Sequence, residues 1–278
     1  MSSIRTIENV IEIKKKLWMG SINLKIVYTN NRNESIEYLI QVFRNSYFPF
    51  IYEKLINFFE NFITDQDVNF ENIWLEYEEV PLKWNYPIGV LYDYLYLPGN
   101  YESQSHIWNL TLKIETASQK FPQDYIIPFR NFDENKYEMH LNEIIVNQLK
   151  QSSFVINGTS KPIMQLSETN SRKLWKSIKY RNLNEYTYLN KLILKTVKNI
   201  PIKLIIPSDG GNMIQLSCSP SITLKEFLNF NCVKLNEIAK PIVHGINVSS
   251  LYELKLIEIW EHLKYLDNIL YITMMVRS

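Results

Sequence analysis

The chain has 278 residues, of which 46% are hydrophobic and 21% are charged. This is an ordinary globular composition that can bury a core, and it argues against a disordered chain. The formal net charge of +1 at pH 7 gives no support for nucleic-acid binding. No stretch approaches 18 apolar residues and the N-terminus lacks the apolar core of a signal peptide, so we expect a cytosolic protein without a membrane span.

The chain opens with a predicted amphipathic helix. Ile7, Val10, Ile11 and Trp18 share one side of this helix, and three lysines lie at its end. Apolar stripes of this kind usually pack into a core, and we expect the same here.

The next hundred residues predict one β-grasp unit. Strands over 21–28 and 35–42 flank a polar turn, and a strand over 72–80, a short helix over 86–96 and a last strand over 106–114 follow. Between the second and third strands, a helix over 48–63 carries side chains at core spacing, namely Phe50, Leu55, Phe58, Phe59 and Ile63.

The middle of the chain predicts helices. Leu141, Ile144, Ile145 and Leu149 form one stripe, and Lys150 falls at the end of that helix, opposite Leu141 and facing solvent. A second helix begins near Thr169, and its expected core positions are Leu174, Trp175, Ile178, Leu189, Leu192 and Ile193.

The C-terminal quarter repeats the β-grasp order. Strands over 200–207 and 213–218 flank a turn with Gly210 and Gly211, and Thr223 and Glu226 have the spacing of a capping box that opens a helix. A strand over 241–246, a helix over 256–266 and a strand over 268–276 complete the unit. The internal repeat favours one particular α+β fold.

We therefore predict two ubiquitin-like β-grasp domains that flank a helix-rich region, with a short N-terminal helix. The expected boundaries are 1–19 for the N-terminal helix, 20–125 for the first ubiquitin-like domain, 126–198 for the helix-rich region and 199–278 for the second ubiquitin-like domain.

Charge is distributed unevenly along the chain. The segment from Lys150 to Arg181 holds seven basic residues and one acid, Glu168, whereas residues 65–79 hold six acids and no base. A basic face suits partner proteins or an anionic membrane surface, and it is equally compatible with a solvated helix.

The residue types that carry catalysis are not arranged for it. Cys218 and Cys232 would need activation by a histidine such as His244, and buried structural thiols are the simpler interpretation. His106, His140, His244 and His262 are dispersed without metal-ligand spacing, and no phosphate-binding glycine motif is present. We expect no catalytic, cofactor or metal site, which favours an interaction protein and leaves Lys150 as a candidate substrate.

Several motifs in order resemble the autophagy protein 5 family, in its yeast-like form. The most specific is EYEEVPLKWNYPIGVLYDYL (76–95), and LWMGSINLKI (17–26), RNSYFP (44–49), SRKLW (171–175) and VHGI (243–246) also match. The ending IWEHLKYLDNILYITMM (259–275) matches with a slightly different spacing after Trp260. The resemblance covers nearly the whole chain and implies the same two ubiquitin-like domains.

The resemblance also implies a covalent modification. One lysine of the family receives an isopeptide bond from the C-terminal glycine of the ubiquitin-like autophagy protein 12, about 25 residues before a Leu-Trp pair. Lys150 stands at that distance from Trp175, whereas Lys161 falls too close. A lysine attacks a thioester only as the neutral amine, and residues 147–160 contain no carboxylate that would hold the amine protonated.

The family's conjugate is expected to bind the coiled-coil autophagy protein 16. It then acts as an E3-like factor in the transfer of autophagy protein 8 to phosphatidylethanolamine, on phagophore membranes in the cytoplasm. E2-like enzymes would supply the reactive thiols, so this chain would not itself be an enzyme. Lys161 and Arg172 are weaker candidates for contact with an anionic membrane or a partner. Two other hypotheses are an unmodified adaptor with two ubiquitin-like domains, and a thiol enzyme that uses Cys218 or Cys232.

Overall fold

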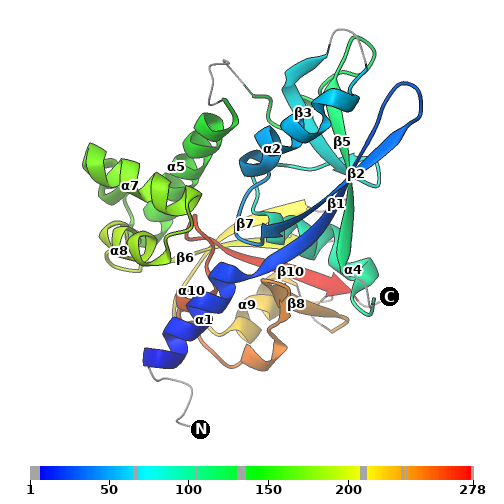
Figure 1. Cartoon of the computed structure of the whole chain (residues 1–278). Helices are drawn as coiled ribbons and strands as arrows, with labels where there is room; N and C mark the ends of the chain where they lie inside the picture. The colour runs from blue at the N-terminus through cyan, green and yellow to red at the C-terminus, as the bar shows by residue number, and fades with distance from the viewer. Residues whose placement is uncertain are drawn as a thin grey trace. The chain divides into compact units, whose positions relative to one another are not determined.

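A computed structural model describes residues 7–64, 68–103, 106–129, 136–206, 212–232, 235 and 237–276 (Figure 1). The chain forms two compact units. One contains α1 (Ile7–Met19), the short stretch Leu97–Gly99 and the chain from Ile145 onward, and the other contains Gly20–Tyr96 and Asn100–Ile144. Within the described ranges, none of the helices combines the length and the apolar composition that a bilayer crossing requires.

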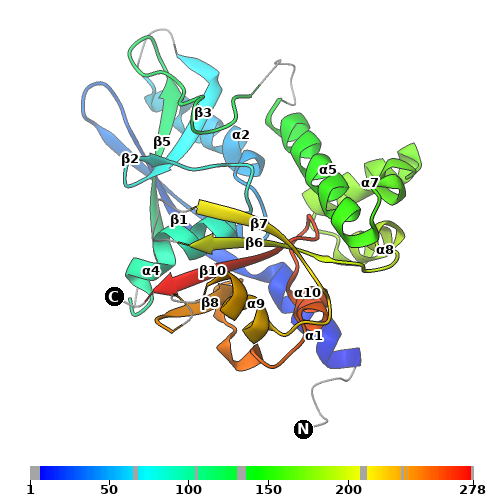
Figure 2. The same ribbon diagram turned by 180° about the vertical axis from the view of Figure 1, so that it is seen from behind.

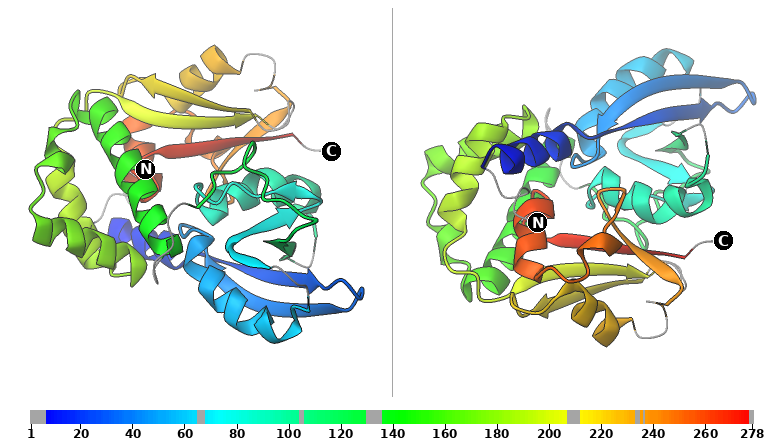
Figure 3. Two further views of the ribbon diagram at one scale, coloured as in Figure 1. Left: turned by 90° about the horizontal axis from the view of Figure 1, so that it is seen from above. Right: turned by 90° about the horizontal axis from the view of Figure 1, so that it is seen from below.

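The first sheet is built on two parallel central strands, β1 (Ser21–Thr29) and β5 (Ile107–Glu115). The strand order is β2-β1-β5-β3-β4, with β2 (Ser35–Phe43), β3 (Asn69–Tyr77) and β4 (Val80–Pro81). The helix α2 (Pro49–Phe59), followed by η1 (Glu60–Phe62), covers one face of this sheet (Figure 3). The remaining elements are α3 (Ile88–Leu91), η2 (Tyr92–Tyr96) and α4 (Leu97–Asn100).

The second sheet repeats the first, strand for strand. Its order is β7-β6-β10-β8-β9, with β6 (Ile200–Ile206) and β10 (Leu270–Val276) parallel at its centre (Figure 2). The other strands are β7 (Asn212–Cys218), β8 (Ala239–Val243) and β9 (Ile246–Asn247), and the helices are α9 (Leu224–Asn231), η4 (Ser249–Leu251) and α10 (Leu256–Leu263). The predicted fold class, with two ubiquitin-like units, is confirmed.

The capping box predicted at Thr223 is present. The Thr223 side chain accepts a hydrogen bond from the backbone N–H of Glu226, and the Glu226 carboxylate accepts one from the backbone N–H of Thr223. Two of the donors that are orphaned at the start of α9 are thereby satisfied.

The two predicted third strands each end three residues earlier than expected, and the chain then turns back. In the first sheet the turn is Glu78–Glu79, with φ of 48° and 65°, and in the second it is His244–Gly245, with φ of 52° and 76°. A two-residue hairpin of this kind requires positive φ at both central positions. The predicted strands over 72–80 and 241–246 therefore split into β3–β4 and β8–β9.

Some predicted packing positions are wrong. Phe58 of α2 is 37% exposed and Phe50 is half-buried, because the buried face of this helix runs through Tyr52, Leu55 and Phe59. In α1, Trp18 is buried as expected but Ile11 is 48% exposed. The predicted glycine turn at 210–211 lies outside the described residues.

Four helices follow the first sheet: α5 (Lys136–Asn157), α6 (Lys161–Met164), α7 (Glu168–Lys179) and α8 (Leu183–Ile193). The single helix predicted from Thr169 is interrupted at Arg181, whose φ is 61°. Asn182 then caps α8 by accepting a hydrogen bond from the backbone N–H of Glu185 at 3.1 Å. The positive φ at Arg181 thus follows the end of α7, and the Asn182 cap starts α8.

Buried polar contacts fasten α8 to the second sheet. The side-chain amides of Asn190 and Asn268 bond each other reciprocally at 2.8 Å, and the Tyr186 hydroxyl donates to the carbonyl of Leu266 at 2.9 Å. The indole of Trp260 donates to the carbonyl of Asn268 at 2.7 Å. The helical region from Ile145 onward and the second β-grasp sheet belong to the same compact unit.

Candidate functional site

Lys150 lies in the interior of α5, and the prediction that the helix ends there is wrong. The helix continues to Asn157 and stops at Gly158, which has φ of 75° and donates its N–H to the carbonyl of Phe154 at 2.8 Å. Glycine in a left-handed conformation just beyond the last turn is a common helix stop. The Asn157–Gly158 pair is the sequence signal that would have located this end.

The last two turns of α5 are held in place by burial and hydrogen bonds. Ile156 is fully buried in the core of the second β-grasp sheet, and its carbonyl accepts from the backbone N–H of Lys198 at 2.7 Å. The Asn157 amide donates to the carbonyl of Ile193 at 3.0 Å and accepts from the N–H of Lys195 at 2.9 Å. The segment that carries Lys150 is thus joined to both α8 and the sheet.

Lys150 is half-buried, whereas the sequence predicted a side chain that faces solvent. Its amine makes no hydrogen bond or ion pair in the part of the chain that the structure describes. The side chains one helical turn away are uncharged on both sides: Val146, Asn147, Ser153 and Phe154. The amine can therefore approach an acyl group without first leaving an ion-pair partner.

Lys161 and Arg172 lie on other helices and are both exposed. Lys161 is the first residue of α6, and Arg172, on α7, is 75% exposed and pairs with Glu168 one turn earlier. Exposed pairs of this kind contribute between 0 and about 1 kcal/mol, so Arg172 can exchange Glu168 for another anion at little cost. Among the described residues, no hydrogen bond or ion pair joins either side chain to Lys150.

Arg181 does not contribute to a basic surface. Its guanidinium lies 4.6 Å from the centre of the Trp18 ring, and its carbonyl accepts from the Trp18 indole at 3.0 Å. Burial lowers the pKa of Arg181 to about 10. Its role is to fasten α1 to the turn between α7 and α8, which removes one cation from the predicted basic face.

Neither cysteine is placed for nucleophilic chemistry. Cys218 is half-buried on β7, Cys232 is buried in the second core, and burial raises the pKa of both thiols. A reactive thiolate requires the opposite shift. His244 stacks on Tyr265 at 3.9 Å, and its Nε2 is hydrogen-bonded to the carbonyl of Leu263 at 3.0 Å. Across the described ranges, no group of three His, Cys, Asp or Glu side chains could hold a metal ion.

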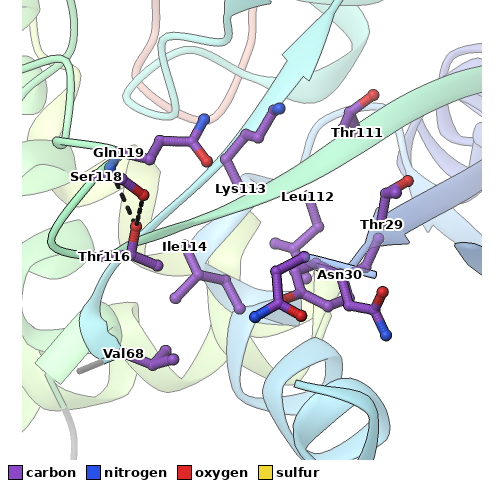
Figure 4. Close-up of a pocket in the computed structure, with 12 residues that line it drawn as sticks. Thr29, Asn30, Val68, Thr111, Leu112, Lys113, Ile114, Thr116, Ser118 and Gln119 are labelled. Carbon is purple, nitrogen blue, oxygen red and sulfur yellow. Dashed lines mark hydrogen bonds between the residues drawn. The ribbon is translucent and has the colours of Figure 1, made fainter. Parts of the chain in front are cut away.

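A polar cavity of about 260 Å³ lies where β1 and β5 diverge (Figure 4). The ladder between these strands ends at Val27 and Thr111, and the residues beyond it line the space. Figure 4 shows Leu112, Ile114 and Asn30 around the opening. The described lining residues include Lys113 and Tyr28 but no cysteine, histidine or carboxylate.

Comparison with known proteins agrees with this architecture over nearly the whole chain. Three models of autophagy protein ATG5 match in order: the UblA domain at residues 17–114, the alpha-helical bundle region at 138–196 and the UblB domain at 199–274.

Curated relatives and a solved structure give the same result. Autophagy protein 5 of Candida albicans is 46% identical over 97% of this chain and 99% of that protein. Autophagy protein 5 of Lodderomyces elongisporus is 40% identical over 99% of this chain and 100% of that protein. The crystal structure of Kluyveromyces marxianus Atg5, at 22% identity, shares the fold with a TM-score of 0.82 over 95% of this chain and 99% of that one. The chain belongs to the autophagy protein 5 family.

Proposed function

We propose that Lys150 accepts an isopeptide bond from the C-terminal glycine of the ubiquitin-like autophagy protein 12. The observation that supports this most directly is an amine without an ion pair on a helix whose end is anchored at Ile156 and Asn157. A fixed backbone and a half-buried side chain limit the positions of the amine, which lowers the entropic cost of reaching a reacting carbonyl.

The reaction is an acyl transfer from sulfur to nitrogen. The neutral amine of Lys150 attacks the carbonyl carbon of a thioester between the modifier's terminal glycine and the cysteine of an E2-like enzyme. The C–N bond forms, the C–S bond breaks, the cysteine leaves as thiolate, and the amine loses its second proton to a base. Since this chain supplies only the nucleophile, it needs no active site of its own.

The conjugate would then act by placement. With the coiled-coil autophagy protein 16 it would form an E3-like complex that promotes lipidation of autophagy protein 8 with phosphatidylethanolamine. This role belongs to a cytoplasmic protein that attaches peripherally to phagophore membranes during autophagosome formation. An exposed basic surface that includes Lys161 and Arg172 fits attachment to anionic headgroups.

The test is an immunoblot of the tagged protein in its own cells. We expect the wild type to migrate largely as a species heavier than its 33.1 kDa by one ubiquitin-like protein, and Lys150→Arg to migrate only as the unmodified chain. Lys161→Arg is the matched control and should be conjugated like the wild type.

Two outcomes would contradict the proposal. A shifted band in Lys150→Arg would assign the acceptor to another lysine. A wild type that is never shifted would favour the alternative, an unmodified adaptor with two ubiquitin-like domains.

A further inference from the structure

We propose that Phe154 is the anchor on which the thioester-carrying conjugating enzyme docks beside Lys150. This inference rests on the proposed function, because it names the surface that the enzyme must use to reach the acceptor amine. It concerns a positioning residue, since Phe154 touches none of the reacting atoms.

Phe154 is an exposed aromatic side chain on the same helix as the acceptor lysine. It is 63% exposed and lies four residues after Lys150, so both side chains project from the same face of α5. The buried side of these turns is already filled by Leu149, Ser152, Ser153 and Ile156. The Phe154 ring therefore lies mostly outside the packed core, where a partner can contact it.

The position of Phe154 makes contact with the enzyme a geometric requirement. Reaction brings the thioester carbonyl to about 3 Å from the amine, and one helical turn rises only about 5.4 Å. The enzyme surface around its cysteine therefore covers the residues one turn away from Lys150. Of those residues, Phe154 offers the largest apolar area, which is the type of side chain that dominates interface energies.

The backbone beneath Phe154 is fixed before any partner arrives. Its carbonyl accepts from Gly158, and the neighbouring Ser153 hydroxyl donates to the carbonyl of Thr159 at 3.3 Å. Ile156 and Asn157 anchor the same turn to the second sheet and to α8. Because this backbone is already ordered, docking costs little conformational entropy there, and Phe154 and Lys150 are a preorganised pair.

The chemistry of the partner surface follows from the absence of charge. Within one turn of Lys150 the described side chains carry no charge, so the enzyme should present an apolar, neutral patch next to its cysteine. Binding through such a patch is insensitive to salt, unlike attraction through the exposed cations Lys161 and Arg172.

The experiment measures initial rates of conjugation in a reconstituted reaction with ATP, the activating enzyme, the conjugating enzyme and the modifier. The concentration of the thioester-charged conjugating enzyme is varied against the full-length chain. We expect Phe154→Ala to raise the KM for the charged enzyme about tenfold or more with kcat nearly unchanged. Phe154→Leu should keep most of the wild-type affinity for the charged enzyme. Added salt should not abolish the difference in KM between Phe154→Ala and the wild type.

Tyr188→Ala is the matched control, because Tyr188 on α8 is also 63% exposed. It should react like the wild type, and the thermal unfolding midpoint of all three variants should be unchanged. Equal KM values for Phe154→Ala and the wild type would overturn the inference, as would a loss confined to kcat. Conjugation that persists in Lys150→Arg would instead overturn the proposed function, so the two failures are distinguishable.

Discussion

At the residue scale, single backbone conformations decide where the candidate site lies. Gly158 is the clearest example, because its positive φ of 75° ends α5 and sets the length of the helix that carries Lys150. A β-carbon there would lie 2.8 Å from Nζ of Lys198, a flexible side chain that can move aside. The cost of any other residue at this position is therefore mainly the left-handed backbone itself.

Gly158→Ala should lower the thermal unfolding midpoint by about 2 °C, since a cost of about 1 kcal/mol moves a chain of this size by that amount. Gly99→Ala is the control: a β-carbon on Gly99 meets no atom within 4 Å, and Gly99 lies in α4. That variant should be unchanged or slightly more stable. Differential scanning calorimetry of both variants measures the effect, and equal midpoints would contradict the explanation.

At the element scale, each of the two β-grasp sheets contains a two-residue hairpin that the periodicity of the sequence does not show. Apolar residues stand on both sides of each turn, at Tyr77 and Val80 and at Val243 and Ile246, so a single strand is predicted where the chain in fact reverses. The second sheet uses His244–Gly245 for this turn, a pair suited to positive φ, whereas the first uses two glutamates. Glutamate in the left-handed region costs about 1–2 kcal/mol, and the pairing of β3 with β4 sustains it.

Glu79→Gly should therefore stabilise the first sheet. Glycine removes the cost of the left-handed backbone but loses more conformational entropy on folding than glutamate does. The first effect is larger by about 0.5–1 kcal/mol, so the unfolding midpoint should rise by about 2 °C. Glu79→Gln keeps the strained backbone and removes only the charge, so it should match the wild type in the same thermal scan. If the glutamine variant is stabilised as much as the glycine variant, charge repulsion and not backbone conformation is responsible.

At the scale of the whole molecule, basic side chains of the helical region are exposed. Lys161, Arg172, Lys173 and Lys176 are all exposed, while Arg181 is withdrawn to pack on Trp18. Each basic residue near an anionic bilayer contributes about 1 kcal/mol, so two of them account for roughly a thirtyfold difference in binding.

Lys161→Glu combined with Arg172→Glu should weaken binding to liposomes that contain anionic lipid by at least thirtyfold, as measured by flotation. The matched control reverses two exposed lysines of the other unit, Lys54→Glu with Lys120→Glu, and changes the net charge equally. The control should bind like the wild type. Equal loss in both variants would show that net charge alone governs binding, and no loss in either would refute a membrane-facing basic surface.

Local patterns determined the order of elements in this protein. The strand and helix sequence of both β-grasp units and the capping box at Thr223 could be drawn from the chain alone, because periodicity and cap spacing act over a few residues. The choice of Lys150 rests on the family resemblance and stays a prediction. The resemblance to the autophagy protein 5 family, now supported by relatives at 46% and 40% identity, also needed no structure.

Only the tertiary structure decided which side chains face a core. It placed Ile156 in the second sheet's core and left Phe154 and Phe58 exposed. It also packed Arg181 on Trp18 and made Lys150 half-buried. These outcomes depend on partners far along the chain, such as Ile193 and Lys198 for the end of α5. Burial is a property of what packs against a helix, and a helix by itself carries no record of its neighbours.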